Sequence, residues 1–147
     1  MDEIEKREAI ELIQMSFEKV STVFIADTGL MSNEPGIMED AIWGHPTEVI
    51  DLGEYPAAAD LWKRLHEADA EKMWIVENVQ LAKDDYIKDV VYYMMKREEY
   101  YPLTMGCSGT IDFSQRKIIM TAKGESIDEA FPEYCIRLWP YVTKVKL

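Results

Sequence analysis

Residues 72–79 read KMWIVENV, and this stretch decides the fold class. Four apolar residues follow one another from Met73 to Val76, before the polar pair Glu77 and Asn78. A continuous apolar run of strand length is typical of a strand that is covered on both faces, as in parallel sheets, whereas a half-exposed strand alternates. The stretch therefore predicts a buried strand in a parallel sheet, with helices on both faces of that sheet.

Helical and extended patterns alternate along the chain on both sides of this strand. Pro56 suits the first turn of a helix that runs to about Asp69. The other elements expected before residue 101 are a helix over 2–20, strands over 21–26 and 47–52, a short helical turn around 37–43, and a helix that begins at Asp84 and Asp85 and ends near Lys96 and Arg97. Strands and helices that alternate at this spacing favour a parallel core with helices on its faces.

The pattern changes after Tyr101. The segments 101–113 and 117–124 are interpreted as strands of a hairpin joined by the turn SQRK. Ser126 and Glu129 form a capping box that predicts a further helix, and Pro140 ends it. The alternating tail over 142–147 is typical of an edge strand. The prediction is one α/β (or α+β) domain over 1–147: a mixed sheet with a parallel core, a C-terminal hairpin, an edge strand, and helices packed on the sheet.

Composition restricts the partners and the compartment. The chain has 147 residues, 28 acidic and 16 basic, for a net charge of −12. Such a charge repels phosphate backbones, so direct binding to nucleic acid is not expected. The apolar runs are shorter than a membrane span, and the N-terminal segment MDEIEKREAIELIQM is acidic and amphipathic, unlike a signal peptide. Two cysteines do not make a disulfide framework. The expectation is a cytoplasmic protein with no membrane partner.

The segment LTMGCSGTID, residues 103–112, raises the question of a reactive cysteine. A reactive thiol needs a depressed pKa, which a helix N-terminus, a cation or a histidine can provide. A strand pattern follows Cys107 rather than a helix, and Gly106 and Gly109 suit a bulge or bend within a strand. The structural interpretation of Cys107 is favoured; a nucleophilic Cys107 would need His45 or His66 as its base.

Other short motifs do not define a catalytic site, and the catalytic residues stay unknown. Residues 27–29 read D-T-G, the triplet of aspartic proteases, which need two such carboxylates on an almost entirely β fold. A turn that ends a strand explains the triplet as well. The two histidines and two cysteines lack metal-ligand spacing, so no metal site is expected. The sequence has neither a Walker loop nor a G-x-G-x-x-G motif, and no cofactor is expected.

Polar residues end three of the expected strands. If these strands are parallel neighbours, their carboxyl ends converge on one edge of the sheet, where ligands collect in α/β folds. Grouped carboxylates need a cation, a cationic ligand or a shared proton. The candidate ligand-binding residues are Asp27, Thr28, Asp51, Glu77, Asn78 and Cys107. The alternative is that Asp and Asn end strands as ordinary turn formers and never meet.

Tyrosines and methionines concentrate over residues 92–101 and give the helix after Asp84 apolar bulk on two faces. Such a helix is buried in the core or lies in a subunit interface. Together with the acidic charge and the missing catalytic motifs, this favours a non-catalytic binding or regulatory protein that acts through protein–protein association, with a homodimer expected. The alternative is a small enzyme or ligand-binding domain with a carboxylate-lined site at the carboxyl ends of the strands.

Overall fold

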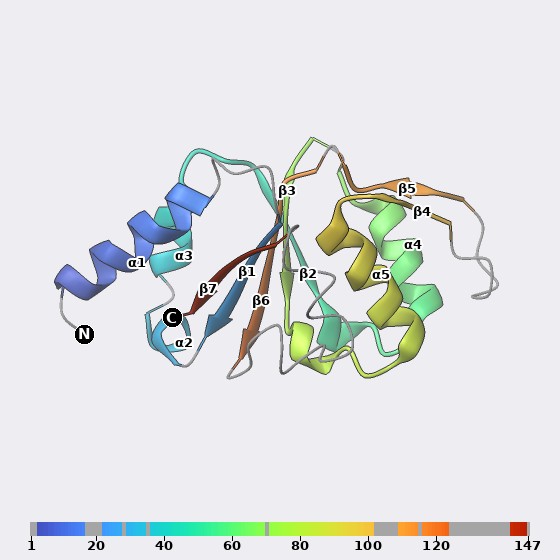
Figure 1. The fold of residues 1–147 in the computed structure, drawn as a ribbon, viewed down its shortest axis with the longest axis horizontal. Coiled ribbons are helices and arrows are strands. Elements are labelled where there is room, and N and C mark those ends of the chain that lie inside the picture. The colour runs from blue at the N-terminus through green and yellow to red at the C-terminus, as the bar shows by residue number, and fades with distance from the viewer. Residues whose placement is uncertain are drawn as a thin grey trace.

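A computed structural model describes most of the chain (Figure 1). The described residues are 3–16, 22–27, 29–34, 36–69, 71–101, 109–114, 116–123 and 142–146. Thr28, Cys107 and the helix expected after Ser126 lie outside them.

Five parallel strands form the main sheet, in the spatial order β2-β3-β6-β1-β7. Their bounds are β1 Thr22–Asp27, β2 Thr47–Asp51, β3 Met73–Glu77, β6 Ile118–Lys123 and β7 Val142–Lys146. The α/β prediction and its parallel core are confirmed. The C-terminal tail is an edge strand as expected, because β7 pairs with β1 at the end of the sheet.

Helices lie on both sides of this sheet (Figure 1). On one side are α1 (Glu3–Ser16) and α3 (Gly36–Ala41), and on the other are α4 (Ala58–Glu67) and α5 (Asp85–Lys96). The shorter helices are α2 (Leu30–Asn33), η1 (Leu52–Glu54) and η2 (Val79–Leu81). Two hydrophobic cores result, one for each layer of helices.

The strand β3 shows why a continuous apolar run was required. Trp74 and Val76 pack into the core shared with α4 and α5, while Met73 packs into the core shared with α1 and α3. All three are at most 5% exposed. Successive side chains of a strand point to opposite faces, so a strand between two helical layers must be apolar at every position.

The predicted start of α5 is confirmed in detail. The side chain of Asp84 accepts hydrogen bonds from the backbone N–H groups of Tyr86 and Ile87, which caps the helix. The helix ends at Arg97, whose backbone is left-handed, with φ of 57°. Within the helix, Met94 and Met95 are both fully buried, so its two apolar faces belong to the core.

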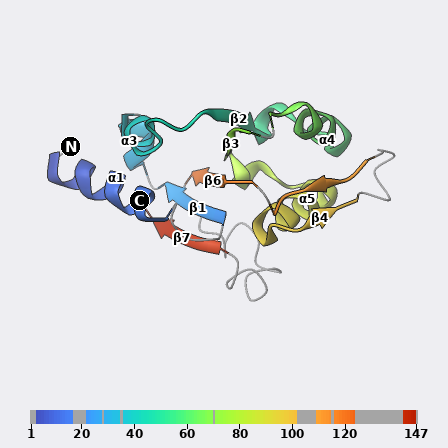
Figure 2. The same ribbon diagram turned by 90° about the horizontal axis from the view of Figure 1, so that it is seen from above.

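The predicted C-terminal hairpin is wrong in its pairing. Residues 118–123 form β6, which enters the middle of the main sheet and pairs in parallel with both β1 and β3. The antiparallel partner of β5 (Ile111–Asp112) is instead β4 (Glu99–Tyr100), and these two make a separate ribbon beside α5 (Figure 2). An apolar run of strand length does not indicate which strand it pairs with. The side chains of β6 are apolar on both faces, and a position in the middle of the sheet buries both of them.

The connections leave the carboxyl edge of the sheet toward different faces. After β1 the chain passes to α2 and α3 on one face, and after β3 it passes to α5 on the other (Figure 1). Such a divergence leaves a crevice at the sheet edge. In the part of the chain described, there is no helix with both the length and the apolar character needed to cross a membrane.

Candidate functional site

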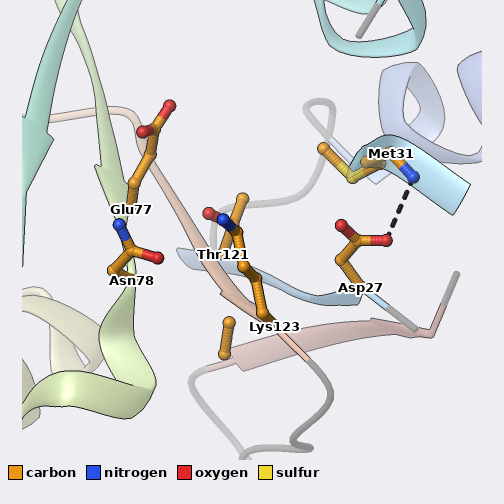
Figure 3. A pocket seen from close by; sticks show the side chains of 7 residues that line it. Asp27, Met31, Glu77, Asn78, Thr121 and Lys123 are labelled. Carbon is orange, nitrogen blue, oxygen red and sulfur yellow. Dashed lines mark hydrogen bonds between the residues drawn. The ribbon is translucent and has the colours of Figure 1, made fainter. Parts of the chain in front are cut away.

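A pocket of about 300 Å³ opens at this crevice, at the carboxyl ends of β1, β3 and β6 (Figure 3). Its lining combines charged, polar and apolar side chains from three strands and from α2. The lining residues are Asp27, Met31, Glu77, Asn78, Thr121, Ala122 and Lys123. In Figure 3, Thr121 and Lys123 lie between Asp27 on one side and Glu77 with Asn78 on the other.

Asp27 ends β1 and is only 6% exposed. Its Oδ1 accepts hydrogen bonds from the backbone N–H groups of Gly29, at 2.9 Å, and Met31, at 3.0 Å. Gly29 has φ of +123°, a conformation that favours glycine, so the chain can turn sharply into α2. Asp27 therefore closes the turn after β1 and holds one wall of the pocket in place.

Asn78 follows β3 and adopts a left-handed backbone, with φ of 59°. Its Nδ2 donates to Oδ1 of Asp51 at 2.7 Å, which joins the ends of β2 and β3. Its Oδ1 accepts from Nε2 of Gln80 at 3.2 Å, and Oε1 of Gln80 accepts from the backbone N–H of Lys123 at 3.1 Å. A chain of side-chain hydrogen bonds thus connects β2, β3 and β6 at the edge that carries the pocket.

Charges of both signs lie in a row along this edge. The registers pair Asp51 with Glu77 and Asp27 with Lys123, so the spatial order is Asp51, Glu77, Lys123, Asp27. Partial burial raises the pKa of the Glu77 carboxyl, and the nearby charge of Asp51 raises it further, whereas Lys123 acts in the opposite direction. A cationic partner would therefore stabilise the charged form of Glu77.

This raised pKa predicts a pH-dependent effect of Glu77→Gln. Below the ordinary pKa of 4.5, Glu77 is neutral in both the folded and the unfolded state, and its burial costs the fold no charge desolvation. As the pH rises through the higher pKa of the folded state, Glu77 becomes charged in the fold and the folded state is destabilised. At pH 7 the variant should melt about 1–3 °C higher than the wild type, the size expected for one unfavourable, partly exposed charge. The difference should vanish below about pH 4. Melting curves from pH 4 to 8 measure it, with the exposed Glu67→Gln as the charge-matched control; equal effects from both variants would refute the assignment.

The structure brings part of the predicted site together. Asp27, Glu77 and Asn78 line one pocket, and Asp51 adjoins it through its hydrogen bond with Asn78. The strands β1, β2 and β3 were expected to be neighbours in the sheet. This is correct for β2 and β3 but wrong for β1, because β6 separates β1 from β3. The lining residue Met31 of α2 was missed, and because of the wrong strand order so were three residues of β6, Thr121, Ala122 and Lys123. The signal for the β6 residues was present, since KIIMTAKG is also an apolar run that ends in polar residues.

Comparisons with known proteins bear on the fold. No protein-family model matches the sequence, and no match was found among curated proteins. The crystal structure of NtrX from Brucella abortus in complex with ATP is similar in fold, with a TM-score of 0.56 at 10% sequence identity. The similarity covers 97% of this chain and 36% of the NtrX chain. The likeness is one of fold. At this identity it assigns no activity to the present chain.

The pocket and the other described residues differ in composition from a cluster of metal-ligating side chains. Among them, no group of three or more His, Cys, Asp or Glu side chains is placed to hold a metal ion. The pocket instead combines two carboxylates with an ammonium, an amide and a hydroxyl group. Such a set is suited to an organic ligand with both donors and acceptors.

Proposed function

We propose that this protein binds a small polar metabolite that carries a protonated amino group, in the pocket at the carboxyl edge of the sheet. One observation carries the proposal: Asp27, Glu77 and Lys123, from three different strands, line a single pocket at the point where the chain connections diverge. Open α/β sheets bind their ligands at such points. This is the ligand-binding alternative of the sequence analysis, now with a defined lining.

The lining is complementary to a molecule with charges of both signs, such as an amino acid. An ammonium group would lie against Asp27 and Glu77, where it would relieve the desolvation of Glu77. A carboxylate or carbonyl oxygen of the same ligand would accept from Lys123 and from the hydroxyl of Thr121. A volume of about 300 Å³ lies at the small end of ligand pockets. The net charge of −12 favours the approach of a cationic group.

The ATP in the NtrX complex is not carried over to this pocket. Phosphate groups would meet the carboxylates of Asp27 and Glu77 with a single lysine, Lys123, among the lining residues to offset them. Like charges at close range disfavour such a ligand. The charge of the lining therefore separates the proposed ligand class from nucleotides.

Thermal shift with a panel of amino acids, small amines and divalent metal salts tests the proposal. A ligand at 100 times its dissociation constant stabilises the fold by about 2.7 kcal/mol, or roughly 5–10 °C for a domain of this size. We expect this shift from a zwitterion or an amine and its loss in Asp27→Asn, which keeps the oxygen that accepts from Gly29 and Met31. Asp60→Asn, on the exposed face of α4, removes the same charge elsewhere and should keep the shift. A panel without any shift, or an equal shift in Asp27→Asn, would contradict the proposal.

Self-association is a second candidate function, favoured by an apolar face on α1. Ile4, Leu12 and Met15 are 66%, 43% and 66% exposed, and they lie on one side of the helix, around the exposed Glu8. Ala9 and Ile13, on the opposite side, are buried against the sheet. A helix with a second apolar face suits contact with another copy of the chain, and two-fold dimers are the commonest oligomers.

The homodimer expected from the sequence therefore has a candidate interface. Analytical ultracentrifugation at micromolar concentration should give twice the chain mass of 17.1 kDa. Met15→Glu should return the protein to the monomer, because it places a charge in the apolar face. Gln14→Glu serves as the control, since it adds the same charge at an exposed position on another side of α1 and should leave the dimer intact. A wild-type protein that sediments as a monomer would refute the idea.

A further inference from the structure

A second, smaller pocket lies at the opposite edge of the sheet. It is formed where β2, β3 and β6 begin and has a volume of about 160 Å³. Its lining residues are His45, Pro46, Glu71, Lys72, Met73, Arg116 and Lys117. Its chemistry differs from that of the carboxyl-edge pocket, because cationic side chains predominate.

The charge of this pocket is opposite to that of the protein as a whole. Lys72, Arg116 and Lys117 are three of the 16 lysines and arginines in a chain with a net charge of −12, and Glu71 is the carboxylate among the lining residues. Lys72, Arg116 and Lys117 immediately precede β3 and β6, which are neighbours in the sheet. Parallel pairing of these strands therefore brings the three cations to one place.

Arg116 is held in a defined position. Its guanidinium carbon lies 4.2 Å from the ring centroid of Trp74, a stacked cation–π arrangement. Trp74 is fully buried, and its Nε1 donates to the backbone carbonyl of Asp69 at 3.3 Å. A guanidinium stacked on an immobile ring loses little further freedom when it binds a ligand, so it is preorganised.

The same guanidinium has donors that the described residues do not satisfy. Its Nε and Nη1 atoms are buried and have no hydrogen-bond partner among those residues. Leaving a buried donor unsatisfied costs about 1–3 kcal/mol, and more for a charged group. Burial lowers the pKa of the Arg116 guanidinium, and the nearby charges of Asp112 and Asp69 act in the opposite direction. Because Arg116 also lines the pocket, an acceptor bound there could receive charge-assisted hydrogen bonds from its guanidinium.

We propose that the amino-edge pocket binds a small oxyanion, the phosphate or carboxylate group of a small molecule, with Arg116 as the anchor. Lys72 and Lys117 provide further positive charge beside it, and 160 Å³ accommodates one such group with little else. The anion would accept hydrogen bonds from the part of the Arg116 guanidinium that lines the pocket. This site is separate from the carboxyl-edge pocket and does not depend on the function proposed there.

Calorimetric and thermal-shift titrations with inorganic phosphate, and separately with succinate, test the site. Sodium chloride keeps the ionic strength constant in every titration. This control is needed because salt screens the nonspecific attraction between anions and the cationic side chains. We expect saturable binding of at least one anion, and the arm that saturates at the lower concentration identifies the class. Arg116→Gln should weaken binding about tenfold or more, the size expected for lost hydrogen bonds to a charged group. Lys117→Gln should weaken it less, and Lys63→Gln, an exposed lysine on α4, should leave it unchanged.

Two results would overturn the proposal. One is that neither anion gives a saturable binding heat or shift in melting temperature beyond that of sodium chloride. In that case the cationic side chains of the pocket serve to balance the charges of Glu71, Asp69 and Asp112. The other is equal affinity in Arg116→Gln and the wild type. If Arg116→Gln does not fold, Lys117→Gln decides in its place, since Lys117 is exposed and its loss should not disturb the core. Unchanged affinity in that variant counts against the site.

Discussion

Trp74→Ala is expected to lower the free energy of unfolding by about 3–5 kcal/mol, the range for a buried tryptophan cut back to alanine. Trp74 is fully buried in β3, which lies between β2 and β6 in the sheet. Its ring packs edge-on against Phe113 at a centroid distance of 6.1 Å and carries the guanidinium of Arg116 on its face. Neighbours held in a sheet relax only in part, so the variant keeps most of the cavity.

Urea denaturation followed by circular dichroism measures this loss as a lower midpoint. The matched control is Trp43→Ala, because Trp43 is 86% exposed. That variant should change the free energy of unfolding by less than about 0.5 kcal/mol. Equal losses from the two tryptophans would contradict the burial of Trp74 in the core between β3 and the helices.

Asn78→Ala is expected to cost about 2–4 kcal/mol, the second largest effect. Part of the loss comes from the left-handed backbone at φ of 59°, which costs alanine roughly 1–2 kcal/mol. The rest comes from the hydrogen bond that Nδ2 of Asn78 donates to the Asp51 carboxylate, since bonds to charged groups contribute about 1.5–3 kcal/mol. The sum is reduced because the site is only partly buried.

Asn78→Gly separates the two contributions. Glycine adopts the left-handed backbone readily, so this variant should lose the side-chain hydrogen bonds and little else. It should therefore be more stable than Asn78→Ala by about 1 kcal/mol. Denaturant midpoints of the three proteins give the comparison. If alanine is tolerated as well as glycine, the left-handed turn after β3 is wrong.

Local patterns were enough to identify most of the elements. The apolar run after Lys72 showed that β3 is covered on both faces, and Trp74 and Met73 indeed pack into opposite cores. Asp84 and Asp85 were identified as the start of α5 because acidic residues suit the positive end of a helix dipole, and the side chain of Asp84 caps that helix. These features depend on residues within a few positions of one another, so they can be read along the chain.

The carboxyl-edge pocket was only half predicted. Asp27, Glu77 and Asn78 were chosen because polar residues end parallel strands where ligands collect. Lys123 was not chosen, because residues 117–124 were interpreted as part of a hairpin. Whether those charges act on a ligand stays a prediction, which the Asp27→Asn comparison tests.

The order of the strands was decided only by the tertiary structure. The sequence by itself indicated a parallel core of strands that alternate with helices, and it placed their polar ends on one edge only on the condition that the strands are neighbours. Which strands are neighbours depends on long-range packing: β6 lies between β1 and β3 and thereby brings Lys123 between Asp27 and Glu77. The same placement sets Arg116 over Trp74 at the other edge. The backbone hydrogen-bonding groups of a strand are the same in every sequence, so they do not select its neighbours. Burial of its side chains against both helical layers selects them, and this burial cannot be read from the apolar pattern of one strand.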